Sequence, residues 1–203
     1  MEDIINIKKN IIQLALILLL FLLCLTYILC KSAYAEDDWA LTLYGSRLTA
    51  DNLGETLTFK AKYEDSYLVV LSVSKSVLSF RELIDIEIEG QAVKHFGDQN
   101  HWEVNGLSVI RWLPFPWDVF IDTSIAAGAG LSYATETPQI EAIGVDHTPK
   151  LLGYLMLEFA FSLPNSPKYL FVARVHHRSG ADGLFDGRLD ASNAIGCGIR
   201  YIF

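Results

Sequence analysis

The segment NAIGCGIRYIF, residues 193–203, carries an apolar side chain at every second position. These positions are Ile195, Cys197, Ile199, Tyr201 and Phe203, and the positions between them include Gly196, Gly198 and Arg200. A repeat of two is the period of a β-strand, in which successive side chains point to opposite faces. The segment therefore predicts a strand with one apolar face and one small or charged face.

The same repeat recurs along the chain after residue 35; Ile84, Ile86 and Ile88, for example, alternate with Asp85, Glu87 and Glu89. Such stretches number eight, at about residues 38–48, 66–77, 82–95, 101–113, 118–134, 150–163, 168–179 and 192–203. Three connections are short (near 80–82, 114–117 and 164–167), three are longer (49–65, 135–149 and 180–191), and 97–100 is the exception. An even strand number with alternating short turns and long loops is typical of outer-membrane β-barrels.

Aromatic residues favour the same architecture. Trp102 and Trp112 stand ten residues apart on one face of a predicted strand, which is roughly 30 Å. This spacing suits two aromatic girdles flanking an outward apolar band. Phe203, with Tyr201 two positions before it, has the pattern of a closing strand that outer-membrane assembly machinery recognises. We predict an all-β protein, an eight-stranded antiparallel transmembrane barrel.

The opposite faces of these strands carry charged side chains, which the barrel would enclose. An eight-stranded barrel is only wide enough inside for side chains, and unpaired buried charges cost several kcal/mol. We therefore expect these residues to pair across the lumen, which disfavours a porin-like transport function. The predicted inward set is Asp85, Glu87, Glu89, Glu103, Arg111, Asp122, Glu158, Arg174, His176, Arg178 and Arg200.

Residues 1–35 have the pattern of a signal peptide helix. Lys8 and Lys9 precede an apolar run at 11–30, and Ala33-Tyr34-Ala35 fits the small-x-small rule for signal peptidase. We predict cleavage after Ala35, which leaves residues 36–203 as the barrel domain. The alternative is an uncleaved membrane anchor, because twenty residues can span a bilayer. A lipoprotein is disfavoured, because leucine precedes both Cys24 and Cys30 where a small residue is required.

Composition sets further bounds. The chain is 51% hydrophobic and has a net charge of −8. Without residues 1–35 it keeps 13 basic and 22 acidic residues, near −9. This balance argues against a nucleic-acid partner, which requires basic patches. Cys197 is the one cysteine after residue 35, so the barrel domain cannot form an internal disulfide.

The stretch VARVHHRSGADG, residues 172–183, places polar side chains on an apolar face. By strand parity, His177 and Ser179 share the outward face with Phe171 and Val175, whereas His176 points inward as a partner for an acidic residue. His177 is expected roughly 23 Å along the strand, near the top of the apolar band. Its neighbours there would be the sugar and ester region of outer-leaflet lipid.

The motifs HWEVNGLSVIRW, GLSYATE, VHHRSG and NAIGCGIRYIF, together with the eight predicted strands, resemble the lipid A 3-O-deacylase family of outer-membrane barrels. The resemblance implies that Ser179 is the nucleophile and that His177 is its general base. The family's asparagine after the serine, which contributes to the oxyanion hole, is Gly180 here, and its backbone N–H remains as a donor. The family's orienting glutamate falls on Asn193, which has outward parity. Asp190 is the nearby alternative, with inward parity.

This resemblance implies a hydrolase that cleaves an ester-linked acyl chain of lipid A, or lipopolysaccharide, in the outer leaflet of a Gram-negative outer membrane. Activity stays an open question at this point, because asparagine can hold the histidine tautomer but cannot stabilise an imidazolium as a carboxylate does. The alternative function is a non-catalytic barrel with a structural or lipid-binding role.

We expect no cofactor and no metal. His95 and His101 lie six residues apart around a predicted turn, with no third ligand evident, and are assigned to a hairpin tip. The segment GADGLFDG, residues 180–187, is rich in glycine and aspartate but lacks the ligand spacing of a calcium loop.

Overall fold

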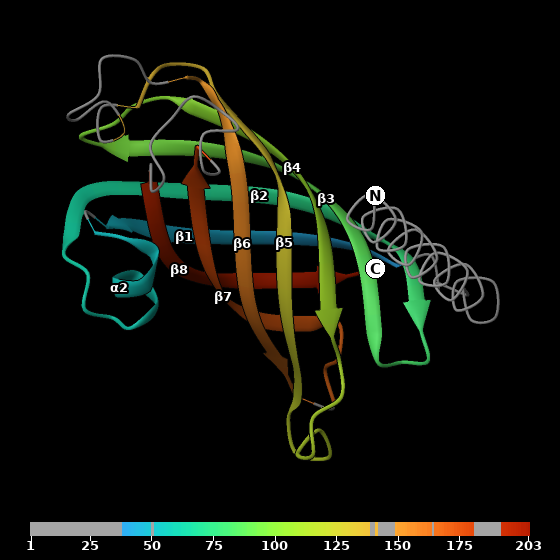
Figure 1. Ribbon diagram of the computed structural model, residues 1–203. Coiled ribbons are helices and arrows are strands. Elements are labelled where there is room, and N and C mark those ends of the chain that lie inside the picture. The colour runs from blue at the N-terminus through green and yellow to red at the C-terminus, as the bar shows by residue number, and fades with distance from the viewer. Residues whose placement is uncertain (1–37, 50, 139–140, 142–148, 164, 181–191) are drawn as a thin grey trace, which may run out of the picture. The chain divides into compact units, whose positions relative to one another are not determined.

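The computed structural model describes residues 38–49, 51–138, 141, 149–163, 165–180 and 192–203. The predicted signal peptide at 1–35, and Asp190, lie outside these residues. The described part folds as eight antiparallel strands, each hydrogen-bonded to its neighbours in chain order, and β8 pairs with β1 to close the barrel (Figure 1). The prediction of an all-β, eight-stranded antiparallel barrel is therefore confirmed.

The strand bounds follow the period-two segments of the sequence. They are β1 Trp39–Thr49, β2 Tyr63–Phe80, β3 Ile84–Gly97, β4 Trp102–Trp112, β5 Asp122–Ala134, β6 Leu151–Ser162, β7 Tyr169–Ser179 and β8 Ser192–Ile202. The strand ends joined between β2 and β3, β4 and β5, and β6 and β7 lie at one end of the barrel, here called the turn end, and the opposite strand ends form the loop end. Among the described residues, no helix combines the length and apolarity needed to span a lipid bilayer.

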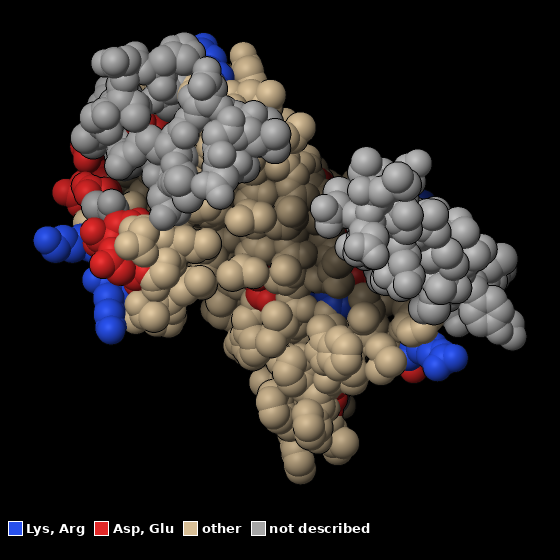
Figure 2. Space-filling view, viewed as in Figure 1, with Lys and Arg blue, Asp and Glu red and all other residues tan. Residues whose placement is uncertain are grey.

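Burial alternates along the strands and separates two faces. In β4, every second residue from Trp102 to Trp112 is exposed and every residue between them is buried. The outward face is apolar, and Figure 2 shows a surface of mostly uncharged side chains with charged ones gathered toward its edges. Exposed aromatic residues mark the two ends of this apolar band: Tyr63, Tyr67, Phe96, Trp102 and Tyr133 toward the loop end, and Trp39, Trp112, Tyr169 and Phe203 toward the turn end. These rings stand where the girdles of a membrane barrel are expected.

Buried ion pairs fill the lumen. The Arg174 guanidinium donates to both carboxylate oxygens of Glu89, at 2.6 and 3.0 Å, and through Nε to Glu158. Arg111 donates to Glu87 at 2.6 Å and lies 2.7 Å from the other oxygen of Glu158. The predicted pairing of charges across the interior is thus observed for these residues, and each buried carboxylate has a cationic partner, as burial of charge requires.

The structure differs from the sequence prediction at the turn end. β5 begins at Asp122, not at 118, because the Asp118 carboxylate accepts hydrogen bonds from the backbone N–H groups of Phe115 and Thr123 and holds a turn. Asp85 and Asp122 were predicted to face the closed interior but are only half-buried. Both line a hollow of about 370 Å³ at this end.

The connection between β1 and β2 contains a short helix, α2 (Leu53–Leu57), that the sequence analysis did not predict. Asn52 caps it, because its side-chain oxygen accepts a hydrogen bond from the backbone N–H of Glu55 at 3.0 Å. Thr56 bonds back to Thr49 at the end of β1, with 2.8 Å between the two hydroxyl oxygens. The helix therefore lies against the barrel, beside β8 (Figure 1).

Candidate functional site

His177 and Ser179 lie at the loop end of β7, on the face that parity predicts to be outward. Phe171, on the same face, is exposed, whereas His177 is only 4% exposed and Ser179 only 7%. Strand parity predicts that both side chains meet lipid headgroups directly. That expectation of exposure is wrong for the described structure, because other parts of the chain cover this corner of the barrel.

Asn193 is the residue directly opposite His177 in the β7–β8 pair. Its side-chain oxygen, Oδ1, lies 2.6 Å from Nδ1 of the imidazole. Outward parity in β8 and the register of the pair bring the two side chains together on the same face. The structure thus joins His177 to one of the two orienting residues considered from the sequence; Asp190, the other, lies outside the described residues.

The hydrogen bonds of Asn193 determine the tautomer of His177. The Nδ2 amide group of Asn193 donates to the backbone carbonyl of Asp51 at 2.9 Å. A carbonyl can only accept, so Nδ2 must face Asp51 and Oδ1 must face the imidazole. Nδ1 of His177 must then carry the proton, which leaves Nε2 as the basic nitrogen, as a general base requires.

The connection between β1 and β2 covers this pair. Asp51 supplies the carbonyl that anchors Asn193, and the Thr49 hydroxyl lies 3.5 Å from the Asn193 carbonyl oxygen. The site is therefore built from β7, β8, the end of β1 and the start of the β1–β2 connection, and only its β7 and β8 members were predictable from alternation.

An apolar groove of about 420 Å³ runs along the outer surface beside His177. Its base includes the outward positions Ser108, Ala127 and Ala129, whose small side chains leave a depression between larger neighbours. The other lining residues are Leu53, Ile110, Gly128, Leu155, Met156, Leu157, Val175 and His177. A groove with this lining suits a hydrocarbon chain, and its position places one end of such a chain against the imidazole.

Ser179 and Gly180 complete the predicted set. Ser179 follows His177 by two residues on the same face, and its partner across the strand pair is Gly153, which has no side chain to occupy the space beside it. Gly180 comes directly after β7 and is buried. The structure therefore places the predicted nucleophile, base and oxyanion residue in one short segment at the end of one strand.

Glu141 lies on the inward side of the loop ends of β7 and β8 and bonds to both strands. Sequence reasoning missed this residue. Glu141 accepts a hydrogen bond from Arg178 at 2.6 Å and another from the Ser192 hydroxyl at 2.7 Å. Burial raises the pKa of Glu141, and the Arg178 guanidinium opposes that rise. Arg178 and Ser192 neighbour the site residues in β7 and β8, so this carboxylate ties the two strand ends together from inside.

His95 and His101, which were assigned to the tip of the β3–β4 hairpin, take different positions in the structure. His95 lies within β3, His101 precedes β4, and both imidazoles are buried, with their ring centroids 4.1 Å apart. Glu103, the next inward residue of β4, lies beside them, its Oε2 2.9 Å from Nε2 of His95. His176 also reaches this carboxylate, with Nε2 at 3.0 Å from Oε1, which matches its predicted role as an inward partner for an acidic residue.

Comparison with known proteins supports the class of fold. No protein-family model and no curated protein matches the sequence. Among solved structures, the chain is similar to Neisserial surface protein A, NspA, with a TM-score of 0.50 and 10% identity over 83% of this chain and 100% of that one. The chain is also similar to the outer membrane protein OprG from Pseudomonas aeruginosa, with a TM-score of 0.45 and 12% identity over 84% of this chain and 98% of that one.

The described chain therefore has the fold of an eight-stranded outer-membrane β-barrel. At this level of identity the likeness extends to the fold alone. The chemistry has to be argued from the residues at the loop end of β7 and β8.

Proposed function

We propose that this protein is an outer-membrane ester hydrolase that removes an acyl chain from lipid A, or lipopolysaccharide, in the outer leaflet. The observation that carries the proposal is the hydrogen bond of His177 to Asn193 at 2.6 Å, two residues from Ser179 and at the edge of an apolar groove on the lipid-facing surface. The apolar outer band and its aromatic margins support a location in that membrane.

In the proposed reaction, Nε2 of His177 takes the proton of the Ser179 hydroxyl while Oγ attacks the ester carbonyl carbon. The resulting oxyanion accepts a hydrogen bond from the backbone N–H of Gly180. The tetrahedral intermediate collapses, the C–O bond to the sugar breaks, and the imidazolium returns its proton to the departing sugar oxygen. Water, deprotonated by the same imidazole, then releases the fatty acid from Ser179.

The groove supports an acyl chain as the group that is recognised. A serine and a histidine two residues apart on one face of a strand are common in proteins, so this placement alone is weak support for hydrolysis. Here the groove adds a binding surface of matching chemistry on the face that contacts lipid, with His177 among its lining residues. A chain lying between Leu155 and Ile110 would present its ester end to the strand terminus that carries Ser179.

Asn193 limits the rate in this proposal. It fixes the tautomer of His177, which is the orienting part of the third residue's role, but it provides no negative charge for the imidazolium that forms during the reaction. Turnover is therefore expected to be slower than in an otherwise equal site with a carboxylate at this position.

The nucleophile can be tested with a long-chain alkyl fluorophosphonate, which forms a covalent adduct with activated serines. The purified barrel in detergent micelles should be labelled at Ser179, located by peptide mass spectrometry, and the His177→Gln variant should not. Ser166→Ala is the matched control, because Ser166 lies in the exposed connection at the turn end. Equal labelling of wild type and His177→Gln would contradict the proposed activation.

A non-catalytic lipid-binding barrel is the second candidate, and the absence of a carboxylate at position 193 favours it. This function retains the groove as a binding surface and needs no reactive serine. It predicts that Ser179 is not labelled, that lipid A still binds, and that filling the groove abolishes binding while Ser179→Ala has no effect.

A further inference from the structure

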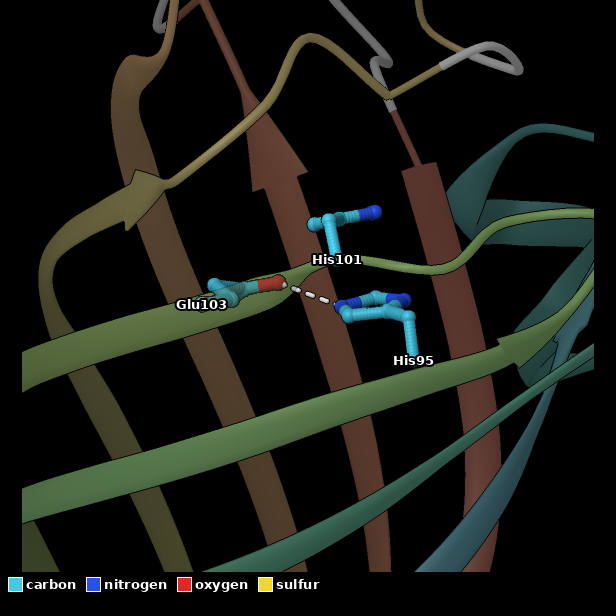
Figure 3. Close-up of side chains that lie close together, drawn as sticks. All are labelled: His95, His101 and Glu103. Atoms are coloured by element: carbon cyan, nitrogen blue, oxygen red, sulfur yellow. Dashed lines mark hydrogen bonds and ion pairs between the residues drawn. The ribbon is translucent and has the colours of Figure 1, made fainter.

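His95, His101 and Glu103 form a compact group inside the loop end of the barrel (Figure 3). All three side chains are buried, and one potential ligand atom from each lies within 4.8 Å of the others. They come from both strands of the β3–β4 hairpin, and the backbone N–H of His95 donates to the carbonyl of His101 at 3.0 Å. The backbone of the hairpin thus brings the three residues together, and the contact of His95 with Glu103 adds to this arrangement.

Some side-chain nitrogen atoms of this group form no hydrogen bond with the described residues and remain as potential metal ligands. Glu103 Oε1 accepts a hydrogen bond from the Ser132 hydroxyl at 2.8 Å and lies 3.0 Å from Nε2 of His176. Its Oε2 lies 2.9 Å from Nε2 of His95, a contact that an ion bound between the two residues would replace. Nε2 of His101 and Nδ1 of His95 are buried and have no hydrogen-bond partner among the described residues. The same is true of both amide atoms of Gln99, a buried residue between the two histidines in the chain. Buried polar atoms without partners are rare and costly, so a group that supplies partners would be favoured here.

We propose that His95, His101 and Glu103 bind one divalent transition-metal ion of the zinc class. Two imidazoles and one carboxylate form a donor set that such ions use, with bonds of about 2.0–2.2 Å. In a tetrahedral site the ligand atoms would then be about 3.4 Å apart. The observed spread of up to 4.8 Å requires a small contraction, and the stacked rings must open so that both histidines direct a nitrogen at the same ion.

Charged side chains of both signs surround the group, and the positive ones point away from it toward other partners. Arg178 is the nearest positive side chain, with Nε 4.0 Å from Glu103 Oε1, and its guanidinium is directed to Glu141 at 2.6 Å. Lys94 is turned outward to Asn100 on the hairpin tip, at 2.6 Å. The carboxylates of Glu103 and Glu141 therefore offset Arg178, and an ion bound here would cross-link the two sides of the β3–β4 hairpin at the loop end.

The test uses the full chain, refolded in detergent without a polyhistidine tag and freed of metal with a chelator. Titration with Co²⁺ should give visible d–d absorption bands that saturate at one ion per chain, and Zn²⁺ should displace them. His101→Gln, at the tip, and Glu103→Gln should each weaken Co²⁺ binding by at least about tenfold. His177→Gln is the matched control, because it removes a histidine from the same end of the barrel but from its outer face.

Saturable binding that is lost in both variants and kept in the control would support the site. Absence of saturable binding, or affinity equal to wild type in His101→Gln, would overturn it. If a variant fails to fold, X-ray absorption spectroscopy of the Co²⁺-loaded wild type identifies the ligands of the ion instead. A first shell with two imidazoles supports the proposal, and one with fewer contradicts it.

Discussion

Nδ1 of His177 donates a hydrogen bond to Oδ1 of Asn193 over 2.6 Å, directly across the β7–β8 strand pair. The carbonyl of Asp51 fixes the orientation of the asparagine, and the asparagine in turn fixes the protonated nitrogen of the histidine. This chain of contacts is the feature that distinguishes His177 from an ordinary polar residue at a strand end. It also makes the site dependent on the connection between β1 and β2.

Asn193 should control the rate of acyl release. Replacing it with leucine, which is similar in size, removes the hydrogen bond to Nδ1 and should lower kcat by about 10²-fold or more, the typical contribution of a positioned general base. Asn193→Asp keeps an acceptor for Nδ1 and adds a negative charge but loses the donor to the Asp51 carbonyl, so its kcat should be well above that of Asn193→Leu. Steady-state hydrolysis of an ester-linked lipid measures both variants, and rates equal to wild type in both would show that Asn193 has no part in the reaction.

Filling the groove should weaken binding of the acyl chain. Ala129→Phe places a large ring in the depression on the outward face of β5 and should raise KM by at least about tenfold, since occluding a pocket by even one methylene-sized group costs 1–3 kcal/mol. Ala92→Phe is the control, because Ala92 is an exposed outward alanine of β3 that does not line the groove. Equal KM values in the two variants would rule out the groove as the acyl site.

The lumen network should dominate the stability of the barrel. Arg174→Met leaves Glu89 and Glu158 without this cation and should lower the free energy of unfolding by about 3–5 kcal/mol. Arg47→Met removes an exposed ion pair with Asp65 and should cost less than about 1 kcal/mol. Urea unfolding in lipid vesicles, followed by tryptophan fluorescence, compares the two. Similar losses of unfolding free energy in both variants would contradict the larger stabilisation expected from the buried ion pairs.

Glu141 should make stability depend on pH. Its pKa is raised in the folded barrel by burial, so the folded state holds this proton more tightly than the unfolded state does. Stability from this group is fully present below its ordinary value of 4.5 and is lost as pH rises through the raised pKa. Between pH 4.5 and 7, wild type should therefore lose unfolding free energy relative to Glu141→Gln. Parallel pH profiles of the two proteins would contradict this assignment.

The strands were predictable because period-two alternation is a local property of the sequence. The predicted segment 192–203 became β8, and the outward parity of His177 and Asn193 followed from the same count. Which residue meets His177 stayed open between Asn193 and Asp190, because alternation gives the face of a strand and not its register with the next strand. Alternation also gave the interior charges, except that Asp85 and Asp122 at the turn end are only half-buried.

The features that could not be predicted from the sequence depend on contacts between segments far apart in the chain. Nothing local in residues 51–57 indicates that the Asp51 carbonyl meets Asn193, because that contact spans 142 positions. Similarly, the pair His95 and His101 lacked a visible third donor, although Glu103 is the next inward position of β4 after the turn. Applying strand parity across the hairpin would have found it.

The most direct test of the account is the mass spectrum of lipid A after incubation with the refolded protein. Wild type should release one ester-linked hydroxyacyl chain per lipid A molecule, Ser166→Ala should do the same, and Ser179→Ala should release none. Intact lipid A after incubation with folded wild type, or equal release by Ser179→Ala, would contradict hydrolysis at this site.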